Sequence, residues 1–253
     1  MYRTFALTAL LAALVAGPSL AHENDVSITR QGDQLCITSN GSPDHDIGSF
    51  PNSGNPHSFE AQTVSVCVDG TPTYTGQMTT ETHSSGISVT GILFRPGTAD
   101  YYDASSPRGH SRDPSSGWNL EGMGSAEALG MDAANAHVDH RGLYHYHAVA
   151  DAFLDNRDDT LIGWAADGFE IHYVGDQAQS SWQLRDGTRV TAPYGAYDGS
   201  YEEDWAFVAG SGNLDQCNGA MMDGEYVYFA TDTFPFFPRC FMGEVSSDFT
   251  GRP

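Results

Sequence analysis

The chain has 253 residues, a formal net charge of −22 and an aromatic content of 11%. All 11 basic residues are arginine, which excludes chemistry that needs a Schiff-base lysine or a phosphate-loop lysine. The acidic balance disfavours nucleic acid and anionic membranes because like charges repel, so we expect neither as a partner.

Residues 1–21 have the pattern of an export signal. Arg3 provides the positive start, residues 5–16 form an apolar run, and small residues precede a cleavage site after Ala21. The run is too short to cross a membrane, so we expect no membrane span and a secreted or periplasmic mature protein. His22 would then be the N-terminus, where its amino group and ring could chelate Cu(II), although a frayed end is the simpler interpretation.

The segment that follows, residues 22–85, is predicted to be an N-terminal β segment with strands at 34–38 and 63–68. Four cysteines in an exported chain predict two disulfides, for which three connectivities exist. We expect Cys36–Cys67 and Cys217–Cys240, because each pair is close in sequence and flanked by strand-like residues. None of the spacings is that of a zinc knuckle.

Residues 86–253 are expected to form a second unit. Alternating runs predict further strands at 86–94, 143–148, 169–174 and 225–230. Helical signals are weak and short, at 125–129 and 148–154. Glycine-rich loops cover 40–55 and 102–124. We therefore expect a mainly β, sandwich-like fold with an internal repeat, long glycine-rich loops and little helix.

The internal repeat pairs residues 131–137 with 214–220, and residues 142–148 with 224–230. Asp, Asn, Gly and two tyrosines occur in both copies, which indicates that they build the unit. The copies differ at three histidines of the first copy, which are replaced by apolar residues in the second: His137 by Ala220, His145 by Val227 and His147 by Phe229. The unit therefore does not need these histidines in order to fold.

The histidine pattern predicts a site for a divalent transition metal, Zn or Cu. His145 and His147 lie two apart on a predicted strand, so their side chains share one face, and His137 in the preceding loop is the expected third ligand. Imidazole is a ligand for both metals. His140 and His172 are weaker candidates. Asp167, in a turn before Gly168, is a tentative base or outer partner of a ligand.

Each of these residues also has an ordinary structural interpretation. A His-x-His pair on a strand is more often a surface or packing feature, His172 is more simply a packed histidine, and Asp167 is more simply a turn residue. His110 lies close to Arg108 and Arg112, which is a poor setting for a metal ion. It suits an anionic substrate better.

At 142–147, Gly-Leu-Tyr-His-Tyr-His, the chain resembles the YHYH-domain proteins, a family of mostly exported proteins named after this tetrapeptide. Residues 135–137, 162–171 and 214–219 also resemble the family pattern, although Ala136 stands where glycine is usual. The resemblance covers roughly 86–243 and makes the histidines characteristic of the family. It implies no established activity.

Three functions are compatible with these features, and the sequence does not decide whether the protein is an enzyme. The first is a metal-binding domain, with a metal-dependent hydrolase as its extension. The second is a binding module without catalysis for a glycan or other small molecule. Its aromatic platforms would be Trp118, Trp164, Trp182 or Trp205. The third is a copper carrier. The sequence has no Gly-x-Ser-x-Gly nucleophile motif and no dinucleotide-binding fingerprint.

Overall fold

The computed structural model describes residues 23–80, 82–155 and 159–250, so the predicted export signal and His22 lie outside the described residues. Within these ranges the chain is mainly β, as predicted, with short strands and helices of three or four residues. The helices are α1 (Ala126–Leu129), α2 (Asp151–Leu154), α3 (Ser247–Thr250) and the 3-10 turns η1 (Pro114–Ser116), η2 (Gly175–Gln177) and η3 (Glu202–Asp204). No helix in the described part of the chain is long and apolar enough for a membrane span.

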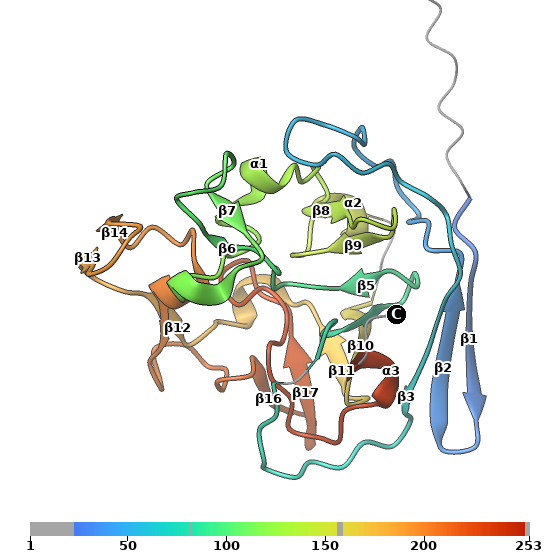
Figure 1. The fold of residues 1–253 in the computed structure, drawn as a ribbon. Helices are drawn as coiled ribbons and strands as arrows, with labels where there is room; N and C mark the ends of the chain where they lie inside the picture. Colours follow the sequence, from blue (N-terminus) through green and yellow to red (C-terminus); the bar gives the residue numbers. More distant parts are fainter. Residues whose placement is uncertain (1–22, 81, 156–158, 251–253) are drawn as a thin grey trace, which may run out of the picture.

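A three-stranded antiparallel sheet forms the N-terminal side of the molecule (Figure 1, blue strands). Its strands are β1 (Val26–Gln31), β2 (Gln34–Ser39) and β3 (Val64–Asp69). Cys36 and Cys67 are directly opposite each other on β2 and β3 and form a disulfide. The second disulfide joins Cys217 and Cys240, so both predicted pairings are confirmed.

The larger sheet has eight strands, in the order β16-β17-β11-β10-β4-β5-β9-β8. Its strands in chain order are β4 (Gly86–Ser88), β5 (Leu93–Phe94), β8 (Ala136–Val138), β9 (Tyr144–Tyr146), β10 (Leu161–Ala165), β11 (Glu170–His172), β16 (Gly219–Met222) and β17 (Glu225–Phe229). The remaining strands form three small hairpin-like sheets: β6 (Tyr101–Tyr102) with β7 (His110–Ser111), β12 (Trp182–Leu184) with β15 (Trp205–Phe207), and β13 (Thr188–Arg189) with β14 (Gly195–Ala196).

The eight-stranded sheet consists of two halves with the same pairing pattern, which extends the sequence repeat. In the first half β4 pairs antiparallel with β5, β5 parallel with β9, and β9 antiparallel with β8. In the second half β10, β11, β17 and β16 follow the same order. The halves meet where β4 pairs antiparallel with β10. Figure 1 shows the two outer hairpins, β8–β9 and β16–β17, far apart in the sheet.

The prediction of one strand over 86–94 is wrong, because two antiparallel strands, β4 and β5, occupy this segment. The chain turns at Gly91, which has a φ of 77° and approaches the N-terminal sheet closely. A Cβ at this glycine would lie 2.3 Å from the Cβ of Ser39. Only glycine allows both this backbone conformation and this contact. The weak helical signals are confirmed as the single turns α1 and α2.

One apolar core joins the two sheets, which makes the arrangement sandwich-like. Ile37 and Val66 come from the three-stranded sheet, and Ile87, Tyr144 and Tyr228 from the eight-stranded sheet. The tyrosines alternate with His145 and Val227 along their strands, so the sheet turns its tyrosine face to this core. The opposite face carries the histidines in the first half.

Candidate metal centre

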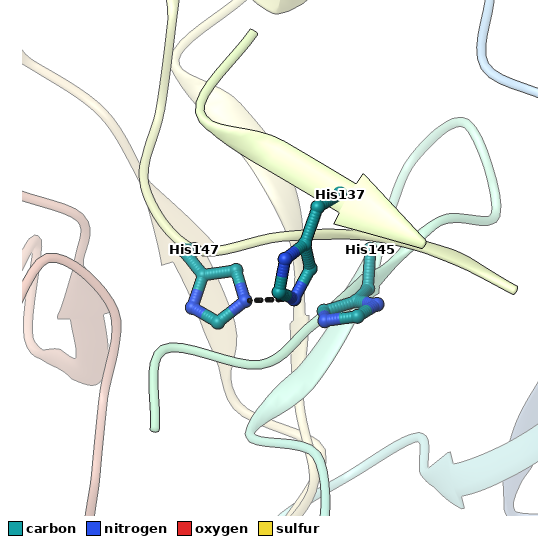
Figure 2. A group of neighbouring side chains, drawn as sticks. All are labelled: His137, His145 and His147. Carbon is teal, nitrogen blue, oxygen red and sulfur yellow. Dashed lines mark hydrogen bonds between the residues drawn. The ribbon is translucent and has the colours of Figure 1, made fainter. Parts of the chain in front are cut away.

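The hairpin β8–β9 holds three histidines on one face of the sheet. His137 on β8 is directly opposite His145 on β9. His147 follows the end of β9, and its backbone N–H donates to the carbonyl of Asn135 at 2.8 Å, which continues the hairpin pairing. Figure 2 shows the three rings turned toward a common point.

The distances between the rings are those of a shared ligand set. Ring centroids are 4.7 Å apart for His137 and His145, 4.8 Å for His137 and His147, and 5.0 Å for His145 and His147. One ring nitrogen from each lies within 4.8 Å of the others. The Nε2 atoms of His137 and His147 are 3.2 Å apart. Zn–N bonds of 2.0–2.1 Å in a tetrahedron separate two ligand nitrogens by about 3.3 Å, so this pair is already at a ligand spacing.

The other nitrogen of each ring faces a backbone carbonyl. Nδ1 of His137 lies 2.9 Å from the carbonyl oxygen of Leu129. Nδ1 of His145 lies 3.1 Å from that of Leu143, and Nδ1 of His147 lies 3.4 Å from that of Pro96. A carbonyl oxygen only accepts hydrogen bonds, so in a neutral imidazole this arrangement places the hydrogen on Nδ1. All three Nε2 atoms then carry lone pairs, and these lone pairs point toward one another.

The surroundings keep the cluster neutral. His145 and His147 are only 5% and 2% exposed. Burial lowers the pKa of His137, and it lowers the pKa values of His145 and His147 well below the usual value, with the neighbouring His137 as the next cause. The neutral form is the one that binds a metal ion. The Nε2 atoms of His137 and His147 are within hydrogen-bond distance of each other, and a bound cation would replace this contact with two metal–nitrogen bonds.

The loop that carries His137 is held by Asp132. One carboxylate oxygen accepts the backbone N–H groups of Ala134 and Ala136, and the other accepts the Tyr144 hydroxyl at 2.7 Å. The second half repeats the arrangement around Asp215, which accepts the N–H groups of residues 217 and 219 and the Tyr226 hydroxyl at 2.8 Å. The residues shared by both copies therefore build the hairpin.

The second half shows what the face becomes without histidines. Ala220, Val227 and Phe229 stand at the three histidine positions and pack in a small apolar cluster with Leu214 and Ala178. The register is unchanged, since Ala220 is opposite Val227 as His137 is opposite His145. The second copy thus fills this face with apolar packing, whereas the first copy directs three ring nitrogens toward one point.

Asp167 does not join the cluster. Its Oδ2 accepts the hydroxyl of Tyr228 at 2.7 Å and the N–H of Gly243 at 2.9 Å, on the tyrosine face of the second half. Burial raises its pKa to about 6. In the first half the equivalent hydroxyl, that of Tyr146, lies 2.7 Å from Nε2 of His45. Asp167 is thus the hydrogen-bond partner of Tyr228, as His45 is of Tyr146 in the first half.

His172 and His140 also lie apart from the three clustered histidines. His172 is buried on β11 in the second half, with its ring nitrogens 3.0 Å from Glu170 and 3.0 Å from Thr160. His140 is exposed and lines the same cleft as the cluster. His110, on β7, lines this cleft too, and its Nδ1 is 3.6 Å from a carboxylate oxygen of Asp100.

The cleft in front of the cluster has a volume of about 650 Å³ and contains residues that sequence reasoning missed. The most important is Arg95, which follows β5 and is 5% exposed. Arg95 occupies the position in the first half that His172 occupies in the second half. This follows from the strand register, because β5 pairs with β9 in the same way as β11 pairs with β17. This equivalence was not visible in the sequence, where the repeat was recognised only in the outer hairpins.

Three of the four tryptophans, Trp118, Trp182 and Trp205, use their rings in contacts within the protein, whereas Trp164 is half-buried and lines a different cleft. Trp118 is buried, and its ring nitrogen donates to the Thr191 hydroxyl. Trp205 stacks on Phe234 at 5.1 Å, and Trp182 packs on the same phenylalanine. These contacts use the aromatic faces inside the protein, so a glycan site on them has no structural support.

Fold and site together define a mainly β protein in which one half of a duplicated sheet carries a three-histidine cluster that could hold a metal ion. Comparison with known families matches residues 63–243 to the family described as YHYH protein. The chain belongs to this family, and the histidines of its name-giving motif are His145 and His147. Searches of curated proteins and of solved structures each found no match.

Proposed function

We propose that the protein is an exported metal-binding protein whose Zn or Cu ion is held by His137, His145 and His147. One observation carries the proposal: three Nε2 atoms converge while each Nδ1 faces a carbonyl. Metal-bound histidines typically donate their other nitrogen to a carbonyl or carboxylate, which fixes the ring orientation. The two disulfides and the export-like N-terminus support a location outside the cytoplasm.

The open side of the cluster favours catalysis over storage. Three protein ligands and an accessible cleft are the arrangement of catalytic zinc sites, in which the fourth position takes water or substrate. A zinc ion there would lower the pKa of its bound water to about 7 and supply a nucleophile for hydrolysis. The chain would contribute the ligands, their orientation and a cleft that holds the substrate beside them. A copper carrier would use the same ligands without turnover.

Metal analysis of the mature protein, purified without an affinity tag, tests the proposal. The H137A/H145V variant takes the residues of the second copy, which fit the same hairpin register. We expect about one metal ion per wild-type chain and none above background in the variant. His172→Ala, at a buried histidine of the other half, is the matched control and should keep the metal. Equal metal content in wild type and H137A/H145V would contradict the proposal.

A further inference from the structure

The cleft in front of the histidine cluster concentrates positive charge in an acidic protein. Five of the eleven arginines of the chain line it, whereas the chain as a whole carries a formal charge of −22. Among the described residues, three carboxylates line the same cleft: Asp100, Asp139 and Glu202. An anion would be drawn to this cleft and repelled by the rest of the surface.

Arg95 is the buried cation of this cleft. Its Nε donates to the Ser84 hydroxyl at 2.9 Å, and its Nη1 pairs with Asp139 at 3.0 Å. Its Nη2 is buried and has no hydrogen-bond partner among the described residues. A buried unpaired donor on a guanidinium is costly unless a ligand accepts from it. The remaining donor is therefore available to a group that enters the cleft.

Arg95 also lies beside the cluster. Arg95 lines the same cleft as all three histidines. In the parallel pairing of β5 with β9, its backbone N–H donates to the carbonyl of Tyr146, the residue before His147. The cleft thus places a guanidinium donor and three convergent imidazoles around one space.

The mouth of the cleft carries further cations. Arg108 and Arg112 flank the β7 strand, and both are exposed. Between them His110 is buried, and its Nδ1 has no hydrogen-bond partner within the described ranges. Arg239, deeper in the cleft, is already engaged by Glu121 and Glu202. Arg141 lies 4.0 Å from the carboxylate of Asp139. Nη2 of Arg95 and the two exposed rim arginines are therefore the donors that we consider for a ligand.

We propose that this cleft binds a small molecule with an oxyanion group, a phosphate, sulfate or carboxylate, which accepts a hydrogen bond from Nη2 of Arg95 beside the histidine cluster. This inference rests on the proposed function, since it assigns the substrate class of the same site. The cleft volume is within the range of small-molecule sites. The second half of the sheet lacks the feature, because His172 stands at the equivalent position and is occupied by Glu170 and Thr160.

Isothermal titration calorimetry of the mature protein with orthophosphate, sulfate and acetate, in chloride buffer and with added zinc or with chelator, tests the inference. We expect saturable binding of at least one anion, with tetrahedral and planar groups distinguished by the three titrations. Arg95→Gln should weaken it by about 10- to 100-fold, the loss expected for one charge-assisted hydrogen bond. R108S/R112S, which changes only exposed side chains, should weaken binding less and reduce its salt dependence.

Arg185→Ser, at an exposed arginine outside this cleft, is the control and should bind as wild type does. Absence of saturable binding for all three anions, or equal affinities of wild type, R95Q and R108S/R112S, would overturn the inference. Metal content measured on the same samples separates the two proposals. If the protein holds metal but binds no anion, the anion inference is refuted and the proposed function is not. If it binds an anion but holds no metal, the proposed function is refuted and the anion site remains.

Discussion

Asp132 and Asp215 offer a matched pair of perturbations within one chain. Each carboxylate accepts two backbone N–H groups and one tyrosine hydroxyl in its own copy of the hairpin, and Asp132 accepts in addition the N–H of Gly48 at 2.9 Å. Replacement by alanine leaves these donors without the partner, and the hydroxyls belong to the buried Tyr144 and Tyr226. Hydrogen bonds to a charged group contribute about 1.5–3 kcal/mol each and are not additive, so we expect D132A and D215A each to lose about 3–5 kcal/mol of unfolding free energy.

The two variants should differ in metal affinity. Asp132 orders the loop that leads into His137, whereas Asp215 orders the loop that leads into Ala220. Loss of a residue that orients a ligand typically lowers metal affinity by about 10- to 100-fold. We therefore expect this loss for D132A and an unchanged dissociation constant for D215A. Urea denaturation gives the stability of each variant, and competition with a chromophoric chelator gives the metal affinity of the folded protein.

Equal metal affinities for D132A and D215A would refute this reasoning, whether both are weakened or both match wild type. A shared loss would mean that metal binding follows overall stability. A shared wild-type affinity would mean that the loop around Asp132 does not position His137.

Two further predictions concern other parts of the sheet. The pKa of Asp167 is raised to about 6 in the folded protein, so protonation of this carboxyl stabilises the fold at low pH, and the stabilisation is lost as the pH rises through 6. The unfolding free energy of wild type minus that of Asp167→Asn should fall by about 2 kcal/mol between pH 4 and pH 8. A constant difference would contradict this prediction. Gly122→Ala would place a Cβ 2.4 Å from Nδ1 of His147, so it should displace this ring and reduce the metal content. In the control Gly97→Ala the new Cβ would have its nearest contact at 3.4 Å, and the metal content should not change. Retained metal in G122A would show that the ring can shift without loss of the site.

The parts of the fold that sequence predicted are those with local signals. Alternation indicated β2, β3, β9, β11 and β17, and the close spacing of the cysteines led to both disulfides. The three histidines were found because the second copy shows the same hairpin without them. The pairing of β5 with β9, and of β11 with β17, links segments far apart in the chain and has no local signal.

The same limit explains what was missed at the site. Arg95 follows a two-residue strand, and only the parallel pairing with β9 brings it to the histidines. Asp167 was predicted as a tentative base or outer partner of a ligand, but the turn that contains it leads into β11, which belongs to the second half. The backbone partners of the rings, the carbonyls of Leu129 and Pro96, carry no residue-type signal. The division 22–85 and 86–253 stays a prediction.

Anomalous scattering from a crystal of the mature protein grown with zinc or copper tests the metal site most directly. Data collected above and below the absorption edge of the metal should show one strong peak bonded to Nε2 of His137, His145 and His147, at about 2.0–2.1 Å for zinc. The Nδ1 atoms should keep their carbonyl contacts with Leu129, Leu143 and Pro96. A metal peak elsewhere, with the three rings unliganded under the same conditions, would contradict the proposal.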